Sequence, residues 1–108
     1  MALVIVDAEN VRRSTWPNLS PADLVARARA WARHEGHGLL VVFDGRAPEE
    51  AEDVAAAPNA DDEIVRVARE AGEPVWVATS DRGLRDRLDG YAQRLIGGGR
   101  FLAELEAA

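Results

Sequence analysis

The sequence predicts an α/β protein with a mainly parallel central sheet of about four strands. Apolar runs that end in an acidic residue recur at 3–7, 39–44 and 75–81. Such uninterrupted runs are typical of strands buried on both faces, because a half-exposed strand alternates apolar with polar residues. Stretches with helical spacing separate the runs, and this alternation favours parallel strands joined by right-handed crossovers.

The N-terminal part of the chain is expected to hold two strands with one helix between them. A first strand at 3–6 is followed by a loop over 11–19. Ser20 has the side chain and the position of an N-cap, and the helix that it begins continues to about Glu35. Apolar residues at spacings of four and three give this helix one buried stripe. The second strand is expected at 39–44.

The C-terminal part is expected to hold two further strands and three helices. The stretch 45–59 contains two prolines and several acids, so we expect it to be exposed, with at most a turn of helix around 48–56. Asn59 then caps a helix over 60–71. The remaining elements are expected in this order: a strand at 74–79, a short helix at 82–88, a short strand at 93–96, and a last helix at 100–106 after three glycines.

Composition limits the compartment and the kind of site. The 108 residues suit a single domain, 1–108, and the absence of cysteine excludes disulfides and thiolate metal sites. No apolar run approaches the ~20 residues of a membrane span, and the first strand is too short for a signal peptide. We therefore expect a soluble cytoplasmic protein. The net charge of −6 argues against a generic nucleic-acid-binding surface but allows carboxylates that hold cations.

Acidic residues at the ends of the predicted strands are the candidates for a site. The carboxyl ends of parallel strands meet at one edge of the sheet, so Asp7, Asp44 and Asp81 are expected to converge there. Asp61 lies three residues before Ile64, on the apolar side of its helix, and is expected to face the same edge.

Carboxylates gathered in this way predict a divalent metal site. They repel one another unless they are protonated or bridged by cations, and oxygen ligands without Cys or His suit Mg²⁺ or Mn²⁺. An alternative stays open, because Asp is also favoured at helix starts, which would account for Asp61 and Asp81 separately. Asp62 is turned by about a hundred degrees from Asp61, and we expect it to be solvated and paired with Arg66.

Arginines on the same edge are expected to contact a phosphodiester held against the metal ions. Trp16 is open to two interpretations, since its ring can stack on an unpaired base or pack against the domain. The candidate substrate contacts are Arg12, Arg13, Arg46, Ser80 and Arg82, with Arg85 nearby.

The chain resembles the NYN domain group of the PIN-like nucleases, and most closely its YacP-like branch. The resemblance covers nearly the whole chain, with its motifs in the right order, and ends on a glycine-rich turn before the last helix. These motifs are the pair Asp7 and Asn10, the stretch Trp16-Pro17-Asn18-Leu19, the strand end Val41-Val42-Phe43-Asp44, the helix start Ala60-Asp61-Asp62-Glu63-Ile64, and Ala78-Thr79-Ser80-Asp81.

The resemblance implies a three-layer α/β/α sandwich and a metal-dependent endoribonuclease. Asp7, Asp61 and Asp81 would hold one or two Mg²⁺ or Mn²⁺ ions, with Asp44 as an additional or water-mediated ligand. Asn10 would orient a carboxylate or contact the scissile phosphate. The expected partner is single-stranded RNA, with messenger RNA and ribosome-associated RNA as candidate sources, and an oligomer stays open.

Two departures from the family pattern bear on substrate contacts. Ala8-Glu9 stands where the family has Gly-Tyr, and the stretch 45–59 is shortened. A non-catalytic RNA- or ribosome-binding module with the same fold is a second hypothesis; the loss of a site acid would favour it, but all of the site acids are present. A phosphatase or receiver domain is disfavoured, because the chain lacks both the Asp-x-Asp motif and any lysine.

Overall fold

A computed structural model describes residues 1–107, and its centre is a five-stranded, wholly parallel sheet. The strands lie in the order β3-β2-β1-β4-β5, so β1 is the central strand. Each crossover returns the chain to the same direction, and all five carboxyl ends therefore lie at one edge of the sheet. The strands are β1 (Leu3–Asp7), β2 (Gly38–Asp44), β3 (Val54–Ala57), β4 (Val75–Ala78) and β5 (Arg94–Ile96).

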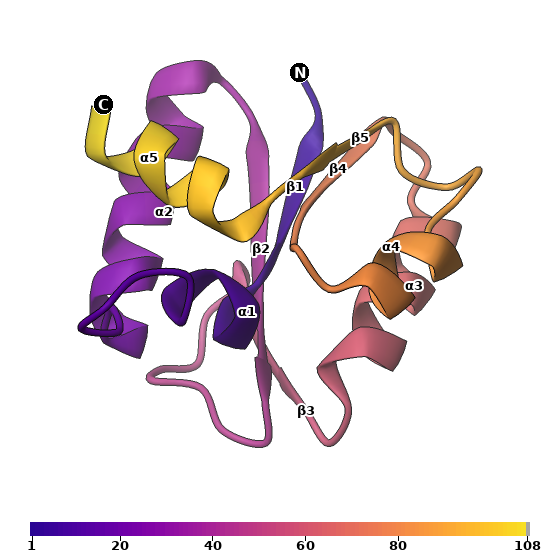
Figure 1. Cartoon of the computed structure of the whole chain (residues 1–108). Coiled ribbons are helices and arrows are strands. Elements are labelled where there is room, and N and C mark those ends of the chain that lie inside the picture. Colours follow the sequence, from indigo (N-terminus) through magenta and orange to yellow (C-terminus); the bar gives the residue numbers. More distant parts are fainter. Residues whose placement is uncertain (108) are drawn as a thin grey trace.

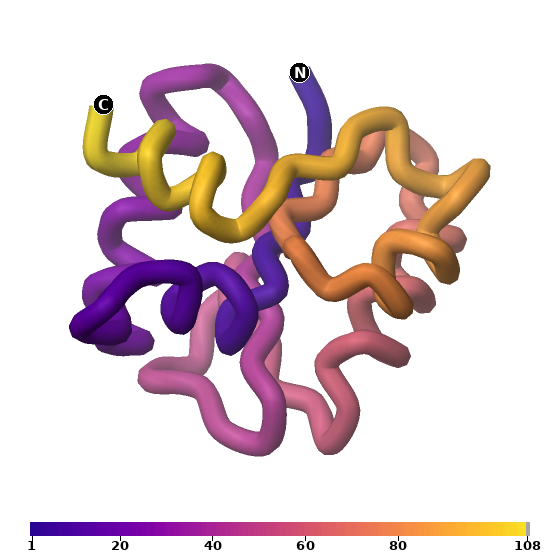
Figure 2. Tube along the Cα trace, in the orientation of Figure 1, coloured from indigo at the N-terminus to yellow at the C-terminus, as the bar shows by residue number. Residues whose placement is uncertain are grey.

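Helices cover both faces of the sheet and complete a three-layer α/β/α sandwich (Figure 1). One layer contains α1, α2 and α5, and the other contains α3 and α4; the chain path between the layers can be followed in Figure 2. None of the helices in the described range is both long and apolar enough to cross a membrane. The helices are α1 (Ala8–Arg12), α2 (Pro21–Glu35), α3 (Ala60–Glu70), α4 (Arg82–Arg87) and α5 (Gly98–Ala107).

Side chains of β1 alternate between two hydrophobic cores, one on each face of the sheet. Val4 and Val6 pack with α2 and α5, whereas Ile5 packs with α3 and α4, and all three are fully buried. This explains the uninterrupted apolar run, because both faces of a central parallel strand are covered. The run ends at Asp7, which places a carboxylate at the carboxyl edge.

Side-chain caps set where three helices begin. Ser20 accepts a hydrogen bond from the backbone N–H of Asp23 (3.1 Å), and Asn59 accepts one from that of Asp62 (3.0 Å). Asp81 accepts one from the backbone N–H of Leu84 (2.8 Å). Caps of this kind satisfy amide groups that have no partner within the helix. They fix the starts of α2, α3 and α4 within one residue of the expected positions.

The structure differs from the expectations in two segments. Residues 8–12, placed before and within the expected loop, form α1, and 54–57 form the edge strand β3 instead of a turn of helix around 48–56. A tertiary ion pair explains the second difference. Arg29 of α2 binds both carboxylate oxygens of Asp53 at 2.7 Å, and the carbonyl of Asp53 accepts the N–H of Val41. This pair holds the stretch against β2, where its backbone completes the ladder.

Candidate active site

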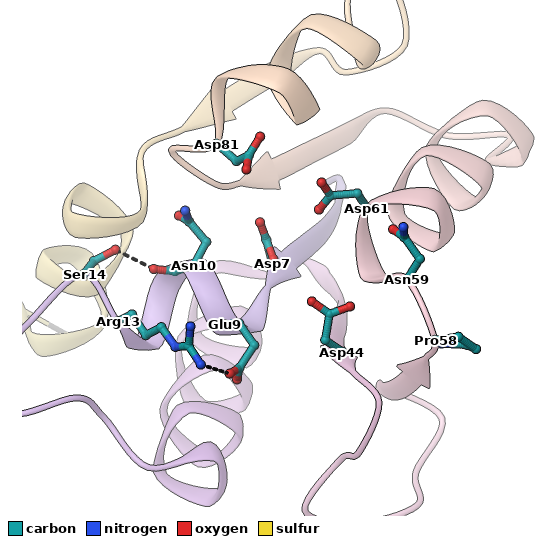
Figure 3. Close-up of a pocket in the computed structure, with 10 residues that line it drawn as sticks. All are labelled: Asp7, Glu9, Asn10, Arg13, Ser14, Asp44, Pro58, Asn59, Asp61 and Asp81. Atoms are coloured by element: carbon teal, nitrogen blue, oxygen red, sulfur yellow. Dashed lines mark hydrogen bonds and ion pairs between the residues drawn. The ribbon is translucent and has the colours of Figure 1, made fainter.

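An open pocket of about 530 Å³ lies at the carboxyl edge of the sheet. Four aspartates from four different elements line it, and Figure 3 shows their side chains around a common space. Asp7 ends β1 and Asp44 ends β2, while Asp61 lies in the first turn of α3 and Asp81 caps α4. The convergence expected from the parallel topology is therefore observed. We refer to this space as the aspartate pocket.

Asp7 is the most deeply buried of the four aspartates, with 6% of its surface exposed. Burial raises the pKa of Asp7 from 3.8 to about 6, and the negative charges of Asp61, Asp81 and Asp44 act in the same direction. The hydroxyl of Thr79 opposes this change by donating a hydrogen bond to Oδ2 of Asp7 at 2.8 Å. The site therefore holds a carboxylate that is costly to ionise unless a cation is close.

Asp61 is in a similar electrostatic environment. Burial raises its pKa, as do the charges of Asp81 and Asp44, and Arg87 partly offsets them. Asp44 and Asp81 each use one carboxylate oxygen to accept a backbone N–H, from Ala60 and Leu84 respectively, both at 2.8 Å. Their second oxygens take no hydrogen bond in the described part of the chain, so they can take a ligand.

The donor set suits a hard divalent cation, but the carboxylates are not assembled around one point. All the acidic groups in the pocket offer oxygen, which Mg²⁺ and Mn²⁺ prefer. Within residues 1–107, however, no three His, Asp or Glu side chains are arranged to hold a single ion. Ligation by three aspartates would require side-chain rotations within the pocket.

Asn10 and Ser80 together connect three segments at the rim of the pocket. Its Oδ1 accepts the backbone N–H of Ser80 at 2.8 Å, and the hydroxyl of Ser80 accepts the N–H of Gly98, also at 2.8 Å. The hydroxyl of Ser14 donates to the carbonyl of Asn10 at 2.7 Å. Asn10 thus positions the loop that leads to Asp81, and its Oδ1 is already used.

Glu9, which stands within Ala8-Glu9 where the resembled family has Gly-Tyr, forms ion pairs with two arginines that were expected to contact the phosphate. Its carboxylate pairs with Arg12 at 2.6 Å and with Arg13 at 3.1 Å. Of the cations expected at the site, only Arg13 lines the aspartate pocket; Arg46 and Arg82 are exposed outside it. The pairing of Glu9 with Arg12 and Arg13 follows from their spacing in the sequence, because helix α1 brings Glu9 within reach of arginines three and four residues later.

Asp62 has a different partner from the one expected, and Thr79 is a site residue that the sequence analysis does not identify. Asp62 is exposed as expected, but it pairs with Arg87 of α4 (2.9 Å), whereas Arg66 pairs with Glu63 and Glu70. Thr79 was not singled out as a site residue, although it is fully buried against Asp7. A polar residue that directly follows a buried apolar run was the available signal.

Comparisons with known proteins identify the fold. No protein-family model matches the sequence, and no curated protein matches it. Among solved structures, the crystal structure of Rae1 (YacP) from Bacillus subtilis superposes with a TM-score of 0.77 at 21% identity, over 99% of this chain and 75% of that chain. A point mutant of the same protein gives 0.75 at 23% identity, over 99% and 76%. The chain therefore has a fold similar to that of Rae1 (YacP).

Proposed function

We propose that the chain is a metal-dependent endoribonuclease that hydrolyses single-stranded RNA in the aspartate pocket. One observation carries the proposal: Asp7, Asp44, Asp61 and Asp81 come from four elements and line one open pocket. The raised pKa values of Asp7 and Asp61 support it, because burial and the neighbouring carboxylates both make these groups costly to ionise, and a bound divalent cation offsets that cost. The similarity in fold to Rae1 (YacP) and the resemblance to PIN-like nucleases are consistent with this chemistry.

Each residue of the pocket has a distinct role in this proposal. Asp7, Asp61 and Asp81 would hold one or two Mg²⁺ or Mn²⁺ ions, and Asp44 would contribute directly or through water. The bound cations would supply Lewis-acid activation of a water molecule and offset negative charge on the phosphate. Thr79 orients the carboxylate of Asp7, and Asn10 positions the loop that carries Asp81. The products expected are a 5′-phosphate and a 3′-hydroxyl.

A second candidate function follows from the arrangement of the carboxylates. Because no three acidic side chains within 1–107 are assembled around one ion, a non-catalytic RNA- or ribosome-binding module is the alternative. The two functions differ in one observable: both bind RNA, but only the nuclease shortens it.

The deciding experiment incubates the pure protein with end-labelled single-stranded RNA in Mn²⁺, in Mg²⁺ and in EDTA. We expect cleavage with either metal and none in EDTA, and we expect 5′-phosphate ends on the products. An Asp7→Asn variant purified in parallel should leave the RNA intact, which excludes a contaminating nuclease. RNA that is bound but stays intact with both metals would favour the binding module instead.

A further inference from the structure

A second, basic pocket lies on the other side of the loop that carries Asp81. It has a volume of about 270 Å³, and its charged lining residues are Arg85 of α4, Arg94 of β5 and Arg100 of α5. Gly97 contributes backbone to the same lining. We refer to this space as the arginine pocket. Its lining includes no acidic residue, in a protein whose net charge is −6.

None of these three arginines has a carboxylate partner closer than 3.8 Å within residues 1–107. Arg85 and Arg100 form no ion pair with a carboxylate in the described range, whereas Arg29, Arg66 and Arg87 each bind one at 2.7–2.9 Å. Arg94 reaches Glu104 only at 3.8 Å, and its guanidinium lies 4.8 Å from the centre of the Trp76 ring.

Three guanidinium groups that share a pocket repel one another, as the four aspartates do. The repulsion is relieved when an anion binds between them. A guanidinium is planar and offers paired N–H donors, which match the oxygens of a phosphate group. The chemistry of the arginine pocket therefore favours a phosphate.

Hydrogen bonds join the arginine pocket to the aspartate pocket. The guanidinium of Arg85 donates to the backbone carbonyl of Thr79 at 3.4 Å, and Thr79 holds Asp7. The N–H of Gly98, next to Gly97 of the arginine pocket, binds Ser80, whose own N–H binds Asn10 of the aspartate pocket. The two pockets thus flank one ridge, formed by 79–81 and 97–98. A polymer with regularly spaced phosphates can occupy both.

We infer that Arg85, Arg94 and Arg100 form a subsite for a backbone phosphate of the RNA strand whose scissile bond lies in the aspartate pocket. The identity of the strand as substrate rests on the proposed function, while binding of the phosphate group rests on the arginine pocket alone. The subsite would hold the strand in register across the ridge and would act on every sequence alike, because a phosphate carries no base identity.

The test measures binding of a short, labelled single-stranded RNA by fluorescence anisotropy in EDTA, over a series of salt concentrations. Arg100→Gln and Arg94→Gln are compared with wild type, and thermal melts check that each variant folds. Arg33→Gln is the matched control, since Arg33 is exposed near the end of α2, at the opposite edge of the sheet. Inorganic phosphate and a polyglutamate peptide are added as competitors.

We expect weaker RNA binding by both pocket variants and a log–log salt slope reduced by about 0.7 for each RNA phosphate that is no longer neutralised. The control should match wild type. Unchanged RNA binding by the variants, or no RNA binding by wild type, would overturn the inference. If the variants lose binding to inorganic phosphate but not to RNA, the pocket binds small phosphates. If polyglutamate displaces the labelled RNA as effectively as unlabelled RNA does, the pocket binds acidic peptides. Either result overturns the RNA assignment.

Failure of this inference can be distinguished from failure of the proposed function. If wild type cleaves RNA with Mn²⁺ while both variants bind RNA normally, the nuclease stands and the subsite is wrong. If wild type never cleaves RNA but its binding depends on Arg94 and Arg100, the subsite stands and the catalytic proposal is wrong.

Discussion

The hydroxyl of Thr79 donates a hydrogen bond to Oδ2 of Asp7 across 2.8 Å, at a point where both residues are buried. The same hydroxyl oxygen accepts the backbone N–H of Asp81 at 3.1 Å. One side chain therefore connects the acid that ends the central strand with the acid that caps α4. This link holds two of the four aspartates in the pocket, although 72 positions separate Thr79 from Asp7 in the sequence.

A Thr79→Val substitution tests that link. Valine keeps the shape of the side chain but removes the hydrogen bond that lowers the pKa of Asp7, so this pKa should rise above about 6. The N–H of Asp81 also loses its acceptor, and we expect a loss of about 1–3 kcal/mol in unfolding free energy. Carbon-13 NMR titration of the Asp7 carboxyl group and urea unfolding measure the two effects. Thr15→Val, in an exposed loop, should change neither.

The pH dependence of stability tests the electrostatic environment of Asp7. Its folded pKa of about 6 lies above the unfolded value of 3.8, so the folded state binds more protons between these values and loses stability as the pH rises through them. The difference amounts to about 3 kcal/mol at most. In metal-free urea unfolding, Asp7→Asn should therefore gain stability relative to wild type between pH 4 and pH 7. A variant that is equally destabilised at both pH values would show that Asp7 serves only the fold.

Two neighbouring acids on α3 give a matched pair for the cleavage assay. Asp61 lines the aspartate pocket, whereas Asp62 is exposed and pairs with Arg87. Asp61→Asn should abolish RNA cleavage, and Asp62→Asn should keep most of it, since each substitution removes one charge from the same turn. Equal losses of kcat/KM in the two variants would contradict the assignment of Asp61 to the site.

Elements with strong local signals could be predicted from the sequence, and the others depend on tertiary contacts. The capped helix that begins after Ser20 and the apolar run of β1 carry their own signals. The edge strand β3 is four residues long, three of them alanine, and is held in place by the pair between Arg29 and Asp53. The helix α1 begins directly after β1 without a side-chain cap, so nothing local marks its start.

The same division holds for the site. Asp7, Asp44 and Asp81 were predictable because parallel topology alone brings strand ends to one edge. The arginines that would contact a phosphate could not be predicted in the same way. An arginine at that edge can bind either a ligand or a neighbouring acid, as Arg12 binds Glu9. The arginine pocket includes Arg100 of α5, which is far along the chain. Arg100 lies beside Arg85 of α4 and Arg94 of β5 only because of the way α5 packs.

Two glycines at the start of α5 provide a test of how tightly the rim of the aspartate pocket is packed. A Cβ atom at Gly98 would lie 2.5 Å from the hydroxyl of Ser14 and 2.8 Å from Oδ1 of Asn10, whereas one at Gly99 would meet nothing within 4 Å. We expect Gly98→Ala to cost about 1–3 kcal/mol through overpacking. Gly99→Ala should be neutral or stabilise the helix by up to about 1 kcal/mol. Denaturant unfolding of both variants measures the difference, and equal stability would show that the rim adapts freely.

Addition of metal gives the most direct test of what the four aspartates do together. A cation that binds only the folded state should raise the melting temperature, and at ~100 times its dissociation constant the gain in unfolding free energy is ~2.7 kcal/mol. Because no three acids within 1–107 are assembled around one point, ligation of one cation by three of them requires side-chain rotation, which weakens the apparent affinity without changing the sign of the effect. Asp7→Asn should lose most of the shift, while Asp62→Asn, which removes the same charge outside the pocket, should keep it. The measurement is a set of thermal melts in EDTA and in millimolar Mn²⁺ on the three proteins. No shift in wild type, or an equal shift in Asp7→Asn, would mean that the aspartates do not form a metal site.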